Sequence, residues 1–268
     1  MSVEAVQHIR RMRGGAQSHL IRCSDGNFYV VKFRDNPQHI RVLANEMLAT
    51  RLAEEAGLPV PETEVIEVSD WLVDNTPELH VQLQHHSIPC EPGKQFGSKY
   101  AADPMKAQVI DYMPVEMLGR VRNLETFAGA LVFDKWTGNA DGRQAVFCRE
   151  HGERKYTAVF IDQGNCFNAG EWTFPDLPLR GVYPKNELYD GILGWNSFEP
   201  WLSRIDQMSE STIWDIANAI PPEWYAGKTE TFHALIHTLI DRRNLTRDLI
   251  SQFRQSVRNP FPRWRSAA

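Results

Sequence analysis

Two segments of the chain carry residues whose types and spacing suit chemistry on phosphate groups. In FDKWTGNADGRQ, residues 133–144, aspartates, an asparagine and glycines interrupt an apolar segment. In FIDQG, residues 160–164, Asp162 directly follows an apolar run. An aspartate before a glycine turn can ligate Mg²⁺, which prefers oxygen, and a loop aspartate such as Asp141 can orient or deprotonate an acceptor hydroxyl. Both segments therefore fit phosphoryl transfer, which depends mostly on positioning and charge neutralisation.

Three features nearer the N-terminus fit the same chemistry. Gly14, Gly15 and Ser18 belong to the turn RGGAQS, and a glycine turn lets backbone N–H groups approach phosphate oxygens. Lys32 ends an apolar strand-like run, and Glu46 lies on the helical stretch that follows. A strand lysine can bridge two phosphates while a helix glutamate holds it in place. Taken alone, each feature also has an ordinary structural interpretation: a lysine that protects a sheet edge, a solvated glutamate and a flexible turn.

The first third of the chain must position these residues, and it is predicted to be a small β-rich unit with one helix. Strands are expected at 18–23 and 28–33, separated by the hairpin signal SDGN. The helix is expected within 39–61, where apolar residues recur at helical spacing until a glycine and two prolines end the pattern. Two further strands are expected at 62–68 and 78–84, which alternate in polarity.

The rest of the chain is predicted to be mostly helical. Residues 86–118 are rich in proline, glycine and polar groups, so we place a boundary between two lobes there, with an N-terminal lobe at 1–92 and a C-terminal lobe at 93–268. The exception to the helical pattern is a β-hairpin, AVFC and KYTAVFI around the turn REHGER. This hairpin delivers Asp162 to its far end.

Composition excludes several classes of protein. The formal charge of −5, the pI near 6.0 and the scattered basic residues argue against a nucleic-acid partner. No apolar run approaches the roughly 20 residues that a membrane span needs. The four cysteines contain no C-x-x-C pair, which favours reduced thiols and argues against a zinc site. We therefore expect a cytoplasmic protein without a membrane partner.

Four segments in this order resemble the HipA-like branch of the protein-kinase-like fold: VVKF, NEMLATRLAEEAGLPVP, GNAD and FIDQG. They are more distantly similar to lipid kinases that carry an N-T-D-R loop and an I-D-x-G metal site. The resemblance covers residues from about 12 to 170. It implies a two-lobed α+β kinase-like fold, with a small antiparallel sheet and one helix in the N-terminal lobe and a larger helical C-terminal lobe. It also implies ATP and Mg²⁺ in the cleft.

The resemblance assigns a role to each matching residue. Lys32 corresponds to the strand lysine on the nucleotide phosphates, and Glu46 corresponds to its ion-pair partner. Asp141 corresponds to the catalytic aspartate of GNAD, and Asp162 to the metal-binding aspartate.

The same resemblance places Gly14, Gly15 and Ser18 in the phosphate loop. In some HipA-like kinases a serine of this loop is autophosphorylated, which ejects the loop and switches the enzyme off. Ser18 is the corresponding candidate in this sequence.

The sequence departs from the family pattern in the catalytic loop. The family usually has a metal-binding asparagine five positions after the catalytic aspartate, where this chain has Val146. Gln144, three positions after Asp141, offers a side-chain carbonyl and is our candidate for the second metal ligand. A rival assignment uses Asp134 and Asn139, which have the D-x-x-x-x-N spacing of protein kinases. We prefer Asp141 because GNAD aligns without gaps and the hairpin to the metal-binding aspartate then has the expected length.

The expected activity is phosphorylation of a serine or threonine in a protein that the sequence does not identify. An antitoxin-type partner is compatible with the resemblance. Three other functions remain open: a kinase for a small molecule or lipid head group, a nucleotide-binding pseudokinase without the usual asparagine, and a non-catalytic interaction module. The last would leave the ordered set of charged residues unexplained.

Overall fold

The computed structural model describes residues 2–102 and 107–265. The outer ends of the two expected lobes, residue 1 and residues 266–268, lie outside the described part, as do residues 103–106. Within the described ranges, no helix is long and apolar enough to cross a membrane.

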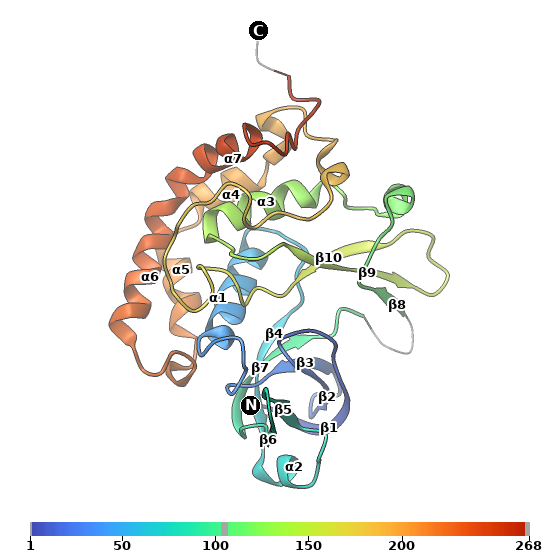
Figure 1. Ribbon diagram of the computed structural model, residues 1–268, viewed down its shortest axis with the longest axis vertical. Coiled ribbons are helices and arrows are strands. Elements are labelled where there is room, and N and C mark those ends of the chain that lie inside the picture. Colours follow the sequence, from blue (N-terminus) through green and yellow to red (C-terminus); the bar gives the residue numbers. More distant parts are fainter. Residues whose placement is uncertain (1, 103–106, 266–268) are drawn as a thin grey trace.

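Five strands close into a barrel in the N-terminal part of the chain, drawn in the lower half of Figure 1. Neighbouring strands are antiparallel, except that the first and last in the barrel order pair in parallel. In barrel order these strands are β1 (Val3–Arg11), β2 (His19–Cys23), β3 (Phe28–Lys32), β7 (Gly93–Lys99) and β4 (Thr63–Val68).

The hairpin expected at 18–33 is confirmed as β2 and β3. Gly26 adopts a φ of +83° in its turn, a conformation that glycine reaches without steric cost. The Asp25 carboxylate accepts hydrogen bonds from the Asn27 backbone N–H at 3.0 Å and from the Tyr29 hydroxyl at 2.8 Å. These local bonds fix the register that brings Lys32 to the end of β3.

Strand β7 corrects the expected boundary between residues 92 and 93. It pairs with β3, with Lys32 opposite Phe96, and with β4, so it belongs to the N-terminal barrel. Its sequence, GKQFGSK, looks like a loop because it is polar and contains two glycines. Gly97 is required there, since a Cβ at that position would collide with the Ile66 side chain of β4.

Two other parts of the N-terminal prediction differ from the structure. Strand β1 was not expected, because its polar and apolar residues do not alternate regularly and none of them is fully buried. The strand expected at 78–84 is shortened to β5 (His80–Gln82), which pairs with β6 (Ser87–Pro89) outside the barrel. A short helix, α2 (Asp70–Asp74), precedes this small hairpin.

Helix α1 (Val42–Glu55) is the expected helix, and it is buried on nearly every side. Gly57, two residues after its end, has a φ of +78° and donates its N–H to the Glu54 carbonyl, which closes the last turn. It contacts strands β4 and β7 on one side and helix α5 on the other. In Figure 1 it lies between the barrel and the C-terminal helices.

The C-terminal part combines helices with a three-stranded sheet. The expected hairpin is confirmed as β9 and β10, and most of the other elements are helices, as expected. The elements are β8 (Ala107–Ile110), β9 (Gln144–Glu150), β10 (Thr157–Ile161), α3 (Thr126–Thr137), α4 (Trp201–Gln207), α5 (Glu210–Asn218), α6 (Thr229–Arg242) and α7 (Thr246–Arg254). Five short 3₁₀ helices join them: Val115–Arg120, Asn186–Tyr189, Trp195–Phe198, Pro222–Tyr225 and Arg243–Leu245.

Two hydrophobic cores hold the molecule together. The smaller core fills the barrel and includes Ile21, Val31 and Ile66. The larger core joins α1 and Phe96 of β7 to α3 and the other C-terminal helices. Helix α1, which carries Glu46, is therefore part of the larger core, and this packing fixes the helix relative to the C-terminal sheet.

Candidate active site

One cavity of about 790 Å³ lies between the barrel and the C-terminal sheet. Its size falls within the range usual for small-molecule and cofactor sites. All the site residues preferred in the sequence analysis line it: Gly14, Gly15, Ser18, Lys32, Glu46, Asp141, Gln144 and Asp162. Segments that are far apart in the sequence thus meet at a single site.

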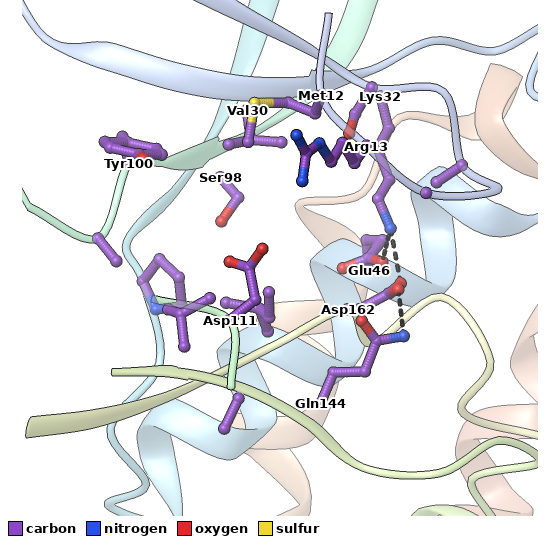
Figure 2. Close-up of a pocket in the computed structure, with 18 of the residues that line it drawn as sticks. Met12, Arg13, Val30, Lys32, Glu46, Ser98, Tyr100, Asp111, Gln144 and Asp162 are labelled. Carbon is purple, nitrogen blue, oxygen red and sulfur yellow. Dashed lines mark hydrogen bonds and ion pairs between the residues drawn. The ribbon is translucent and has the colours of Figure 1, made fainter. Parts of the chain in front are cut away.

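Lys32 is the centre of a buried ion-pair triad with two carboxylates. Its Nζ pairs with Glu46 Oε1 and donates to Asp162 Oδ1 at 2.8 Å (Figure 2). Burial alone would lower the pKa of Lys32, but the charges of Glu46 and Asp162 outweigh it and raise this pKa above its ordinary value. Burial would raise the pKa of Asp162, but the charge and hydrogen bond of Lys32, together with smaller contributions from its other neighbours, outweigh burial and lower this pKa. Glu46 behaves differently, because its burial outweighs the nearby Lys32 charge and raises the pKa of its carboxyl above the ordinary value.

Glu46 also fixes the turn that carries the metal-binding candidate. Its carboxylate accepts the backbone N–H groups of Gln163 at 3.0 Å and of Gly164 at 2.8 Å. A Cβ on Gly164 would lie 2.8 Å from a methyl of Val42 and 3.1 Å from Glu46 Oε1, so only glycine allows this approach. Asp162 itself has a φ of +60°, a strained conformation for a residue with a side chain. Helix α1 thus determines where the Asp162 carboxylate lies.

Asn45 is a second anchor on α1, and the sequence analysis missed it. Its side-chain amide donates to the carbonyls of Gly164 at 2.9 Å, Cys166 at 3.0 Å and Ala169 at 2.8 Å, and its Oδ1 accepts from Trp172 Nε1 at 2.8 Å. The residue is almost completely buried. A polar pair, Asn-Glu, within an apolar helix was the available sequence clue.

The loop expected to be catalytic, residues 139–143, follows α3 and presents Asp141 at the cavity; it is called the catalytic loop below. Asp141 is exposed, its backbone N–H donates to Asn139 Oδ1 at 3.1 Å, and its Oδ1 accepts from the Gly142 N–H at 2.7 Å. Asn165 Nδ2 reaches its other oxygen at 3.5 Å. An accessible carboxylate on a tight loop is suited to holding an incoming hydroxyl.

Gln144 and Asp162 are the residues best placed to share a metal ion. Gln144 Nε2 donates to Asp162 Oδ2 at 2.8 Å (Figure 2), and rotation of the amide would present its carbonyl oxygen instead. Among the described residues, no group of three or more His, Cys, Asp and Glu is arranged to hold a metal. Mg²⁺ is commonly held by one or two protein oxygens together with substrate phosphates, so this sparse donor set fits a metal that arrives with a nucleotide.

The rival aspartate, Asp134, lies in a different environment. It is 2% exposed, it does not line the cavity, and both of its oxygens are occupied by Asn139 and Arg143. A buried and fully bonded carboxylate is not available to an acceptor hydroxyl. The position of Asp141 on the cavity wall supports our preference for it.

The glycine turn forms the roof of the cavity. Gly14 has a φ of +116°, its carbonyl accepts from the Gln17 N–H at 3.3 Å, and Met12 N–H donates to the Ser18 carbonyl at 2.8 Å. Ser18 is buried, so its hydroxyl is sheltered in this closed arrangement. Arg13, which the sequence analysis did not single out, directs its side chain into the cavity (Figure 2).

The other end of the cavity has an apolar and aromatic lining. Val30 and Tyr100 contribute apolar surface, while Ser98 and Asp111 contribute polar groups (Figure 2). Such a combination suits a heteroaromatic base attached to a polar sugar. Asp111 and Tyr100 lie in the stretch expected to be an irregular connection, which hid their contribution.

Solved structures of several kinases share this fold. The proinflammatory kinase CtkA of Helicobacter pylori has a TM-score of 0.59 at 14% identity, over 95% of this chain and 99% of that one. The Golgi casein kinase gives 0.53 at 12% identity, over 94% and 73%. HipA of Shewanella oneidensis, solved with HipB and operator DNA, gives 0.51 at 13% identity, over 94% and 68%. At these identities the likeness concerns the fold, and it confirms the expected kinase-like α+β class.

Sequence comparison supplies the family. No curated protein is significantly similar to the chain in sequence. The family model described as HipA-like kinase matches residues 5–153, which is more than half of the chain and includes the glycine turn, Lys32, Glu46 and Asp141. The chain belongs to the HipA-like kinase family.

Proposed function

We propose that this kinase uses ATP and Mg²⁺ and transfers the γ-phosphate to a serine or threonine hydroxyl of a protein. The observation that carries the proposal is the Lys32–Glu46–Asp162 triad, which lies in the same cavity as the exposed carboxylate of Asp141. Phosphoryl transfer requires charge neutralisation on one side and a positioned nucleophile on the other. This cavity offers residues for both.

The nucleotide would lie with its base toward Val30 and Tyr100 and its phosphates toward Lys32. Lys32 neutralises phosphate charge, and Glu46 keeps its ammonium group from turning away. Arg13 supplies a second positive charge from the glycine turn. The contacts of Lys32 with two carboxylates leave the triad with a net negative charge, so a tetra-anionic nucleotide needs additional cations to bind.

Asp162 and Gln144 would hold Mg²⁺ in this cavity. The ion would neutralise the phosphates and orient them for in-line attack. A Golgi casein kinase structure of similar fold contains Mn and ADP (TM-score 0.50, 12% identity, over 96% of this chain and 73% of that one), which supports the use of a nucleotide with a divalent metal here.

Asp141 would accept a hydrogen bond from the acceptor hydroxyl and take up its proton as the phosphate is transferred. The bond from the terminal phosphorus to the bridging oxygen breaks, and ADP leaves as the acceptor oxygen bonds to phosphorus. Because the Asp141 side chain is exposed, an acceptor on a large molecule has access to it. We also propose that Ser18 is autophosphorylated. An antitoxin-type partner is proposed as well, and both proposals are based on similarity to HipA-like kinases.

Incubation with labelled ATP tests the proposal. We expect the wild-type chain to label an acceptor protein in an extract, with the label on serine or threonine by mass spectrometry. The Asp141→Ala and Asp162→Ala variants should transfer no label. Equal labelling by all three proteins would contradict the assigned residues, and absence of transfer from a wild-type chain that binds ATP would identify a pseudokinase instead.

A further inference from the structure

Asp134 and Arg143 form a buried ion pair beneath the catalytic loop. Arg143 Nε donates to Asp134 Oδ2 at 2.9 Å and its Nη2 pairs with Oδ1, so the guanidinium grips the carboxylate with two bonds. Both side chains are at most 2% exposed. Asn139 Nδ2 donates to the same carboxylate at 3.0 Å. Asp134 on α3 therefore binds residues at both ends of the loop.

Asp141 lies between Asn139 and Arg143, the two ends of the loop that these contacts hold. Asn139 holds Asp134 with its amide nitrogen and receives the Asp141 backbone N–H on its oxygen at 3.1 Å. A later segment of the chain also contacts the loop, since the Gly181 N–H donates to the Asp141 carbonyl at 3.1 Å. Gly181 has a φ of +62°, and a Cβ there would lie 2.9 Å from the Asp134 Cβ, so the chain closes tightly over the loop.

The guanidinium also reaches the strand that carries the metal-binding candidate. Arg143 Nη1 donates to the carbonyl of Ile161 at 3.2 Å, one residue before Asp162. The next residue after Arg143 is Gln144, whose amide contacts the Asp162 carboxylate. One side chain thus ties together α3, the catalytic loop and the end of β10.

Burial of this ion pair gives little stability by itself, because desolvation of two charges offsets most of their attraction. An apolar pair of similar volume would fill the same space. An apolar pair would not form the directional hydrogen bonds to Asn139 and to the Ile161 carbonyl, and it would not link the two ends of the loop. The contacts therefore point to a role in geometry.

We propose that Asp134, Asn139 and Arg143 form a clasp that sets the separation between Asp141 and Asp162. The proposal rests on the proposed function for the roles of those two aspartates. The catalytic loop has two residues fewer between its aspartate and the metal-binding amide than the family pattern, and the clasp holds this shorter loop in shape. Asp134 does not line the cavity, and Arg143, which does, commits its guanidinium to Asp134 and to the Ile161 carbonyl. We therefore treat both as positioning residues.

The Arg143→Lys variant tests the clasp, with Arg242→Lys as the matched control. Arg242 is equally buried and also grips an aspartate, Asp176, while donating to the carbonyls of Trp136 and Lys135 away from the cavity. We expect Arg143→Lys to lower kcat about 10- to 100-fold, since a displacement near 1 Å has effects of that size. It should also raise the Mg²⁺ concentration for half-maximal rate and leave the Kd for ATP nearly unchanged. Arg242→Lys should keep wild-type values of all three.

Hydrogen exchange gives a readout that does not depend on activity. Exchange of the peptide covering residues 139–145 should become about tenfold faster in Arg143→Lys and stay unchanged in Arg242→Lys. If the wild type transfers no phosphate, the proposed function fails, but this exchange comparison still decides whether the clasp holds the loop.

Two results would overturn the clasp. One is a wild-type kcat and wild-type exchange in Arg143→Lys, and the other is an equal loss of kcat in both lysine variants. If Arg143→Lys does not fold, the double variant Asp134→Leu with Arg143→Met removes both buried charges together. That protein should bind ATP but transfer phosphate slowly, and a wild-type kcat would refute the positioning role.

Discussion

Lys32 is held between two carboxylates, and this arrangement sets the response of the site to pH. The pKa of Asp162 is lowered from its ordinary value of 3.8, despite burial, because of the Lys32 charge. The pKa of Lys32 is raised from 10.5 because the charges of Glu46 and Asp162 outweigh burial. Stability from the lowered acid is present above its ordinary pKa and is lost as the pH falls through the folded value. Stability from the raised base is present below 10.5 and is lost at higher pH.

Between these ordinary values of 3.8 and 10.5 the Lys32–Asp162 pair keeps both charges, so we expect this pair to add no pH dependence of its own to the binding of Mg²⁺-ATP there. In Lys32→Met, Asp162 loses the charge that lowers its pKa, so the acid limb of the binding curve should move to higher pH. Calorimetric titration of ATP at several pH values measures this shift. The matched control is Lys135→Met, which removes a buried lysine that does not line the cavity. An acid limb that moves equally in both variants would contradict the triad.

The sequence was sufficient to select the residues of the cavity but not their partners. Lys32 and Asp162 could be found because each is a charged residue at the end of an apolar run, and Glu46 because it lies on the helix that follows Lys32. The partners of Asp134 could not be found, because a D-x-x-x-x-N spacing is equally compatible with catalysis and with the internal bond that the structure contains. The burial of Asp134 and its bonds to Asn139 and Arg143 separate the two interpretations, and only the structure contains them.

Helix α1 acts on the active site through its hydrogen bonds to residues 163–169. Replacing Asn45 with Ala would leave three buried carbonyls and the Trp172 indole N–H without this partner. We expect the free energy of unfolding to fall by about 2–4 kcal/mol, measured by urea denaturation. Asn75→Ala is the control, since its amide bonds one carbonyl at an exposed helix end, and it should change stability by less than about 1 kcal/mol. Similar losses in the two variants would contradict the anchoring role of α1.

At the scale of elements, turn and helix signals within a segment predicted the hairpins and helices that interactions within the same segment stabilise. The β2–β3 hairpin, α1 and the β9–β10 hairpin all have turn or helix signals in their own sequence, and they are confirmed. Strand β7 was missed because its place depends on Ile66 packing over Gly97, a contact between distant segments. The residue pattern of a single strand does not show which distant segment will pack against it.

At the scale of the whole molecule, the large core crosses from α1 into the C-terminal helices. Trp224 Nε1 also donates to the Lys94 carbonyl of β7 at 3.0 Å, and Arg204 Nη1 donates to the Ala56 carbonyl after α1 at 3.4 Å. A core shared in this way favours cooperative unfolding. We expect one transition, with coincident midpoints by tryptophan fluorescence and far-UV circular dichroism. Two separate transitions would show that the barrel and the helices unfold independently.

The chain as a whole is proposed to transfer phosphate through Asp141, and one comparison tests this most directly. The rate of γ-phosphate transfer at saturating Mg²⁺-ATP should be measured for the wild type and for Asp141→Asn, with ATP affinity measured on the same samples. We predict an ATP affinity unchanged within about twofold and a transfer rate at least about 100-fold lower in the variant. An Asp141→Asn protein that binds ATP and transfers phosphate at the wild-type rate would contradict the proposed mechanism.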